Sequence, residues 1–96
     1  MSVVVRHQPI GLTREKYDQV SESMGGEGAW PPDGLDMHVM FGTEGQLTVS
    51  EIWDSEEQFR SFFERLKNAL NDAGVEFGDP QVFEVHELQK REGAAT

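Results

Sequence analysis

An alternating strand that runs directly into a capped helix, at residues 45–59, constrains the fold of this chain more than any other feature. Residues 47–50 read Leu-Thr-Val-Ser, the period-two pattern of a half-buried strand, which is expected to end at Trp53. Ser55 is a typical N-cap, and Gln58 three residues later completes a capping box. Apolar residues at helical spacing then form one stripe: Phe59, Phe62, Phe63, Leu66 and Leu70. The junction therefore predicts a sheet strand followed at once by an amphipathic helix.

The rest of the chain supplies a second helix and three more strands. A β-branched run predicts the first strand at residues 3–8. A short helix is expected to begin after the N-cap Thr13 and to end at the Gly-Gly pair at 25–26. Further strands are expected at residues 35–41 and 81–88. The order β-α-β-β-α-β predicts an α+β, ferredoxin-like domain, in which a four-stranded antiparallel sheet carries both helices on one face.

This length suffices for one domain, which we place at residues 1–90, with residues 91–96 as a disordered tail. Helices on one face leave the other face of the sheet bare, and a second copy of the chain is the simplest cover. We therefore expect a homodimer. Residues 25–34 are rich in glycine and proline and predict a loop without regular structure, in which Trp30 is either a lid or an anchor.

The composition argues against several classes of function. The formal net charge is −10 and the 8 basic residues are scattered, which disfavours binding to nucleic acid or to anionic membranes. The chain has no cysteine, so disulfides, thiolate metal sites and cysteine nucleophiles are excluded. No apolar run approaches the roughly 20 residues that span a bilayer, and the first residues lack the pattern of a signal peptide. A cytoplasmic location fits these observations.

Two registers are open for the hairpin of the second and third strands. A two-residue turn would place His38 opposite Glu51, whereas a three-residue loop would place Leu35 opposite Trp53. We prefer the three-residue loop, because it separates apolar from polar side chains. The side expected to face the helices would then carry Leu35, Met37, Val39, Phe41, Leu47, Val49 and Trp53. The other side would carry Asp36, His38, Thr48 and Ser50.

Glu51 is the one charged residue on the side expected to face the helices. A carboxylate among apolar side chains is costly unless it is paired or opens onto a cavity. One interpretation is a general base in a small-molecule pocket. The other is an ion pair with a lysine or arginine at the rim of the sheet, which is the more common arrangement. The sequence leaves both open.

The three histidines fall on expected strands, at His7, His38 and His86. Their spacing does not enforce the tetrahedral convergence that zinc requires, so we predict no metal site. His38 and His86 are candidates for a catalytic or cavity-lining role beside Glu51. In the last strand, Phe83 is expected to face the core and His86 the opposite side. Each histidine can equally be a hydrogen-bonded structural residue.

The strand-to-helix junction at residues 51–59, Glu-Ile-Trp-Asp-Ser-Glu-Glu-Gln-Phe, resembles the antibiotic-biosynthesis-monooxygenase-like group of the dimeric α/β-barrel superfamily. Residues 32–41, 53–63 and 83–86 are similar to small actinobacterial-type members of that group, so the resemblance covers nearly the whole chain. It implies a dimer formed by sheet-to-sheet packing and a ligand pocket between the sheet and the helices. That pocket would lie near Tyr17, Met37, Glu51, Trp53, Phe62 and His86.

The superfamily includes cofactor-free monooxygenases, haem-degrading enzymes, isomerases and members with no known activity. Its haem-degrading members carry an asparagine on the first strand, which residues 3–8 lack, and a tryptophan and a histidine on the second helix, which residues 59–70 lack. The resemblance therefore implies a protein without cofactor, a monooxygenase or isomerase acting on a small aromatic or polyketide-like substrate. Its base would be Glu51, His38 or His86, and its substrate-binding residues would be Tyr17, Met37, Trp53 and Phe62. The alternative is a non-catalytic ligand-binding or structural homodimer.

Overall fold

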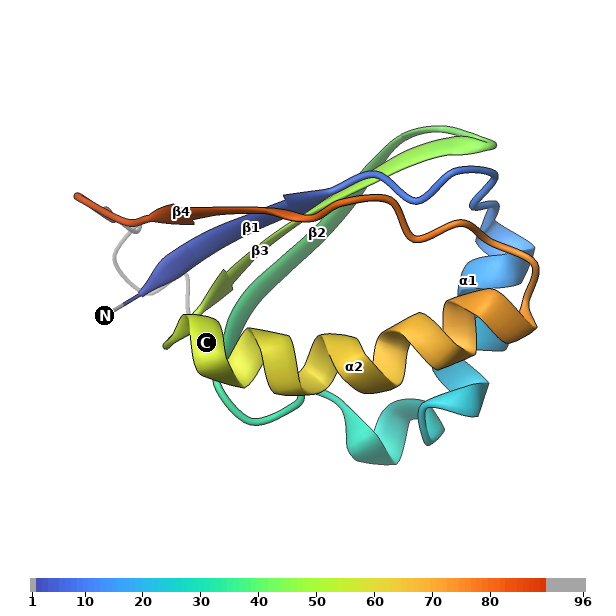
Figure 1. Ribbon diagram of the computed structural model, residues 1–96, viewed down its shortest axis with the longest axis horizontal. Coiled ribbons are helices and arrows are strands. Elements are labelled where there is room, and N and C mark those ends of the chain that lie inside the picture. The colour runs from blue at the N-terminus through green and yellow to red at the C-terminus, as the bar shows by residue number, and fades with distance from the viewer. Residues whose placement is uncertain (1, 90–96) are drawn as a thin grey trace.

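The computed structural model describes residues 2–89 and has the predicted order of strands and helices. Four strands, β1 (Val3–His7), β2 (Leu35–Thr43), β3 (Gln46–Trp53) and β4 (Gln81–Glu84), form one antiparallel sheet in the order β2-β3-β1-β4. Helices α1 (Arg14–Ser23) and α2 (Glu56–Asp72) lie on one side of this sheet (Figure 1). The predicted ferredoxin-like fold is therefore confirmed. The tail predicted at residues 91–96 lies outside the described residues.

Both helices begin at the residues that the sequence predicts. The Thr13 side chain accepts a hydrogen bond from the backbone nitrogen of Lys16 at 3.2 Å, and the Ser55 side chain accepts one from Gln58 at the same distance. Gly74 follows α2 with a φ of 77°, a left-handed conformation that glycine adopts without strain. In the part of the chain that the structure describes, no helix is both long and apolar enough to cross a membrane.

The segment at residues 25–34 is more regular than predicted, because it contains a 3₁₀ helix, η1 (Gly26–Ala29). A single 3₁₀ turn is too short to show an apolar period in the sequence, which is why composition alone predicted an irregular loop. In Figure 1 this segment follows α1 and passes below α2 before the chain enters β2.

The β2–β3 hairpin follows both registers that the sequence left open, one on each side of a β-bulge. From the turn to Met37, the strands pair as a two-residue turn requires, and His38 lies opposite Glu51. A bulge between Leu35 and Met37 then restores the pair of Leu35 with Trp53. The preference for a three-residue loop is therefore wrong for most of β2, because the extra residue is taken up in the bulge and not in the turn.

The observed register exchanges the faces of β2. Met37, Val39 and Phe41 point away from the helices and are each 43% to 44% exposed, while His38 faces the helices. The predicted orientation of β4 is also wrong, because Phe83 is 53% exposed on the same side as Val4. We call this side the outer face of the sheet, defined by Met37, Val39, Phe41 and Phe83. The side toward the helices is the inner face.

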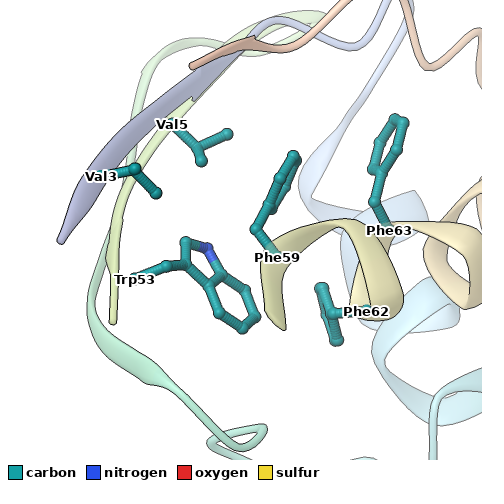
Figure 2. Packing of buried hydrophobic residues seen from close by; sticks show 6 residues of the cluster. All are labelled: Val3, Val5, Trp53, Phe59, Phe62 and Phe63. Atoms are coloured by element: carbon teal, nitrogen blue, oxygen red, sulfur yellow. The ribbon is translucent and has the colours of Figure 1, made fainter. Parts of the chain in front are cut away.

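Side chains from β1, β3 and α2 pack into an aromatic cluster between the sheet and α2 (Figure 2). The Trp53 ring is fully buried, 5.4 Å from the Phe62 ring and 5.8 Å from the Phe59 ring between centroids. The cluster consists of Val3, Val5, Trp53, Phe59, Phe62 and Phe63. A second, aliphatic cluster joins α1 to the C-terminal half of α2 and consists of Leu12, Val20, Leu47, Ala69, Leu70 and Val75.

Candidate functional site

Three polar side chains from three elements are hydrogen-bonded in a chain on the inner face. His38 and Glu51 are opposite each other on β2 and β3, and His38 Nδ1 lies 2.6 Å from Glu51 Oε2. The Tyr17 hydroxyl, on α1, lies 3.3 Å from the other ring nitrogen of His38, Nε2. The two-residue turn and the packing of α1 over the sheet thus bring together residues that are far apart in the sequence.

The second oxygen of Glu51 is also occupied. The indole nitrogen of Trp53, two residues along β3, donates to Glu51 Oε1 at 3.0 Å. Glu51 is only 7% exposed, and both carboxylate oxygens have a donor, as a buried carboxylate requires. Among residues 2–89 its ion-pair partner is His38, and no lysine or arginine at the rim of the sheet pairs with it.

The distances define a consistent set of proton positions. With its proton on Nδ1, His38 donates to the Glu51 carboxylate, and Nε2 accepts from the Tyr17 hydroxyl. Burial raises the pKa of Tyr17 above its ordinary value of 10.0; the charges of Glu51 and Asp18 raise it further, and Arg14 lowers it. Tyr17 is therefore a protonated phenol at neutral pH and can act as a donor.

The chain of polar groups opens onto a cavity between the sheet and the helices. About 80 Å³ of this cavity is open to water-sized molecules, several times the ~15 Å³ that one water needs by this measure. Its wall is mostly apolar and combines members of the aliphatic cluster with Phe62 of the aromatic cluster. Its aromatic and titratable side chains include His7, Tyr17, Trp30, His38, Glu51 and Phe62.

The structure brings four of the seven predicted site residues together at this cavity: Tyr17, His38, Glu51 and Phe62. Trp53 does not line it; the Trp53 side chain lies in the aromatic cluster behind Glu51 and reaches the site only through its hydrogen bond.

Two predicted site residues lie elsewhere and are corrected. Met37 is on the outer face, 43% exposed, because the hairpin register turns it away from the helices. His86 is exposed and does not line the cavity, because β4 ends at Glu84 and not at Leu88 as predicted. The sequence alternation of the apolar residues Phe83 and Val85 suggested that they face the core. Phe83 instead lies on the outer face, so the alternation misled the prediction.

His7 is a cavity residue that the sequence reasoning did not select. It ends β1 on the inner face, opposite Val49, and is 7% exposed with its ring edge against Phe63. Its Nδ1 atom is buried without a hydrogen-bond partner in the described part of the chain. Burial lowers the pKa of His7 below 6.5; Glu51 raises it and His38 lowers it. The period-two alternation from Val3 and Val5 would have placed His7 on the inner face.

Trp30 is the second cavity residue outside the predicted set. It follows η1, and its ring meets the His38 ring edge-on at 5.0 Å and the Phe62 ring at 6.3 Å. Because Trp30 is 44% exposed, it forms the part of the cavity wall that borders solvent.

A chain of this kind can move a proton. If a bound molecule gives a proton to the Tyr17 oxygen while Tyr17 passes its own to His38 Nε2, the resulting imidazolium is stabilised by the Glu51 carboxylate. No group of three or more histidine or carboxylate side chains within residues 2–89 is arranged to hold a metal ion.

Comparison with solved structures places the fold among known proteins. A Deinococcus radiodurans protein assigned as an antibiotic biosynthesis monooxygenase aligns over 94% of this chain and 99% of its own, with a TM-score of 0.60 and 16% identity. SnoaB, a cofactor-independent oxygenase from Streptomyces nogalater, aligns over 94% and 96%, with a TM-score of 0.56 and 15% identity.

A monooxygenase from the gene ActVA-Orf6 of Streptomyces coelicolor, in complex with Nanaomycin D, aligns over 94% of this chain and 92% of its own, with a TM-score of 0.53 and 19% identity. No protein-family model matches the chain, and no curated protein matches its sequence. The resemblance noted in the sequence is thus confirmed as a shared fold, and at these identities the fold is what the likeness shows.

Proposed function

We propose that this protein is an enzyme that removes a proton from a small aromatic or polyketide-like molecule, as a cofactor-independent monooxygenase or isomerase. The observation that supports this proposal is the Tyr17–His38–Glu51 chain, which opens onto a mostly apolar cavity. A histidine held between a carboxylate and a second polar group is a general arrangement for acid–base catalysis.

The proposed reaction begins at the Tyr17 oxygen, which takes the acidic proton of a phenol or enol while His38 accepts the phenolic proton of Tyr17. Removal of that proton gives an electron-rich anion. Attack of O₂ on the anion leads to oxygenation, and return of the proton to a different carbon leads to isomerisation. SnoaB, which shares the fold, is a cofactor-independent oxygenase, and this favours the first outcome.

The proposal includes a homodimer, in which a second copy covers the outer face. The outer face supports this arrangement because it exposes four large apolar side chains at 43% to 53% of their surface, Met37, Val39, Phe41 and Phe83. Both helices cover the inner face, so no described element of the same chain packs on the outer one (Figure 1).

The proposed activity is tested by oxygen uptake with anthrone, whose oxygenation consumes one O₂ and releases one water as anthraquinone forms. We expect the variants Tyr17→Phe and His38→Gln to lower the rate by about a hundredfold or more, the usual contribution of a positioned acid–base group. His86→Gln is the matched control, because it changes an exposed histidine outside the cavity. Equal rates of oxygen uptake for His38→Gln and His86→Gln would refute the role of His38 as the acceptor of the Tyr17 proton.

A non-catalytic ligand-binding or structural homodimer remains the second candidate. The observation that favours it is that both Glu51 oxygens already accept hydrogen bonds that join β2 to β3 and fix the Trp53 ring. Titration with Nanaomycin D, followed through tryptophan fluorescence, to which Trp30 at the cavity and the buried Trp53 contribute, separates the two. Saturable quenching without oxygen uptake or isomerisation of any enolisable aromatic in a panel would favour the ligand-binding role.

A further inference from the structure

The proposed proton relay, which consists of Tyr17, His38 and Glu51, does not explain the position of His7. Its ring lies in the cavity wall on the strand next to Glu51, yet it makes no hydrogen bond to Tyr17, His38 or Glu51. Its Nδ1 atom is buried without a partner in the described part of the chain. A buried N–H group without an acceptor is costly to keep, so the burial of Nδ1 constrains which ring nitrogen carries the hydrogen.

The burial of Nδ1 decides which nitrogen a ligand can meet. Because Nδ1 is inaccessible, a molecule in the cavity reaches the His7 ring through Nε2. A neutral imidazole carries one hydrogen. Placing it on Nδ1 would bury an N–H without an acceptor, whereas placing it on Nε2 directs the N–H toward the cavity. The tautomer with hydrogen on Nε2 is therefore the less costly one.

The surroundings of His7 keep it neutral. Burial lowers its pKa, and the neighbouring His38 lowers it further, against the opposing effect of Glu51. Phe63 packs against one edge of the ring at 5.8 Å between centroids. When the relay places a proton on His38, the positive charge of His38 disfavours a second positive charge on His7. His38 can thus take the proton while His7 remains an uncharged hydrogen-bond donor.

We propose that His7, through its Nε2–H, donates a hydrogen bond to the ligand oxygen on which negative charge develops when the relay removes a proton. The ligand class that fits is a planar enol or phenol with a carbonyl or hydroxyl oxygen turned toward β1 and its aromatic body against the Phe62 and Trp30 side chains of the cavity wall. A neutral donor fixed at such an oxygen stabilises the anion more than the neutral molecule. The inference rests on the proposed function for the origin of that anion.

The first test needs no ligand and no turnover. A long-range ¹H–¹⁵N correlation spectrum of the full chain, with the His7→Phe variant to identify the signals, reports which nitrogen carries the proton. We expect His7 to be neutral at pH 7 with its hydrogen on Nε2. A His7 that is charged at pH 7, or that carries its hydrogen on Nδ1, would overturn the inference whether or not the protein is an enzyme.

The second test measures binding of 2-hydroxy-1,4-naphthoquinone, an enolate at neutral pH, beside 1,4-naphthoquinone. The variants His7→Phe and His7→Asn should weaken enolate binding about tenfold, since a hydrogen bond to a charged group is lost. They should weaken binding of the uncharged quinone threefold or less. His7→Gln, whose amide nitrogen can occupy the place of Nε2, should restore most of the enolate affinity. Circular dichroism checks that each variant is folded.

The outcomes separate this inference from the proposed function. Equal enolate affinity for the wild-type protein and for His7→Phe, or no binding of either quinone to the wild-type protein, would overturn the role of His7. The expected His7 tautomer and the expected quinone affinities would support His7 as a hydrogen-bond donor. If, in the same protein, the rate of anthrone oxidation did not depend on His38, that result would refute the proton relay without affecting the role of His7.

Discussion

The two faces of the sheet distribute their side chains in opposite ways, and each departs from what a half-buried sheet normally shows. The inner face, covered by helices, buries the polar residues His7 and Glu51 at 7% exposure each. The outer face, open to solvent in the single chain, exposes Met37, Val39, Phe41 and Phe83 at 43% to 53%. A typical antiparallel sheet has apolar side chains inward and polar ones outward.

Each face therefore carries side chains that are unfavourable in the folded single chain, and for a different physical reason. This difference indicates that the two faces have different functions. The inner polar groups are tolerated because hydrogen bonds among Tyr17, His38, Glu51 and Trp53 satisfy most of them. The exposed apolar side chains of the outer face contribute no hydrophobic stabilisation until another surface covers them. Full burial of one large apolar side chain contributes about 1.5–3 kcal/mol of stabilising free energy. Local departures of this kind are expected at functional sites and interfaces.

The largest effect should come from breaking the inner face. Replacement of Glu51 by alanine leaves His38 Nδ1 and Trp53 Nε1 without their acceptor. We expect the free energy of unfolding to fall by about 3 kcal/mol, as for a buried polar network that loses one member. Urea denaturation measures the loss. The control is Glu64→Ala, an exposed glutamate paired with Lys67, which should cost ~0.5 kcal/mol or less. Equal stability of the two variants would show that the fold does not need the inner polar network.

A slightly smaller effect is expected from a charge on the outer face. Val39→Asp places a carboxylate at the middle of the proposed subunit interface, and we expect self-association to weaken by a hundredfold or more, about 2.7 kcal/mol. Light scattering over a range of protein concentrations measures this change. Ser61→Asp, on the exposed surface of α2, is the matched control and should leave the mass unchanged. A wild-type protein that is monomeric throughout would refute the homodimer.

The smallest effect is a dependence of stability on pH that comes from the inner face alone. The folded-state pKa of His7 is lowered below 6.5 by burial, so the unfolded chain binds a proton more readily. Stability is therefore fully present above about pH 6.5 and falls as the pH drops below it, by at most ~1.4 kcal/mol per pH unit. Urea denaturation between pH 7.5 and 5.5 should show a steeper fall for the wild-type protein than for His7→Phe. Parallel curves would mean that His7 keeps its ordinary pKa.

Much of the fold was predictable because the signals are local. Thr13 and Ser55 mark the helix starts through their own hydrogen bonds to the backbone, and the stripe that begins at Phe59 marks the face of α2 that packs on the sheet. These signals operate within one or two turns of chain. They do not depend on how distant strands are paired.

The site was less predictable because it depends on register. The turn around Gly45 accommodates either loop length, and only the position of one extra residue decides whether His38 or Val39 faces the helices. Residues on β4 were misplaced because Phe83 and Val85 alternate as an apolar pair, although Phe83 faces outward and Val82 is the residue opposite Val5 on the inner face. The period-two pattern of the first strand could have placed His7 on the inner face. The approach of Trp30 to His38 could not be predicted in this way, because it depends on tertiary packing.

The bulge between Leu35 and Met37 separates, by the position of one residue, a sheet that carries the inner polar chain from a sheet that does not. Moving the same extra residue from the bulge into the turn would reverse every side chain between them, so that Val39 would face the helices and His38 would face solvent. One insertion paired with one deletion would then remove the Tyr17–His38–Glu51 chain while leaving every member of it in the sequence. Homologues can therefore differ in function through small length changes in this hairpin, and a comparison of residue identities alone would miss the difference.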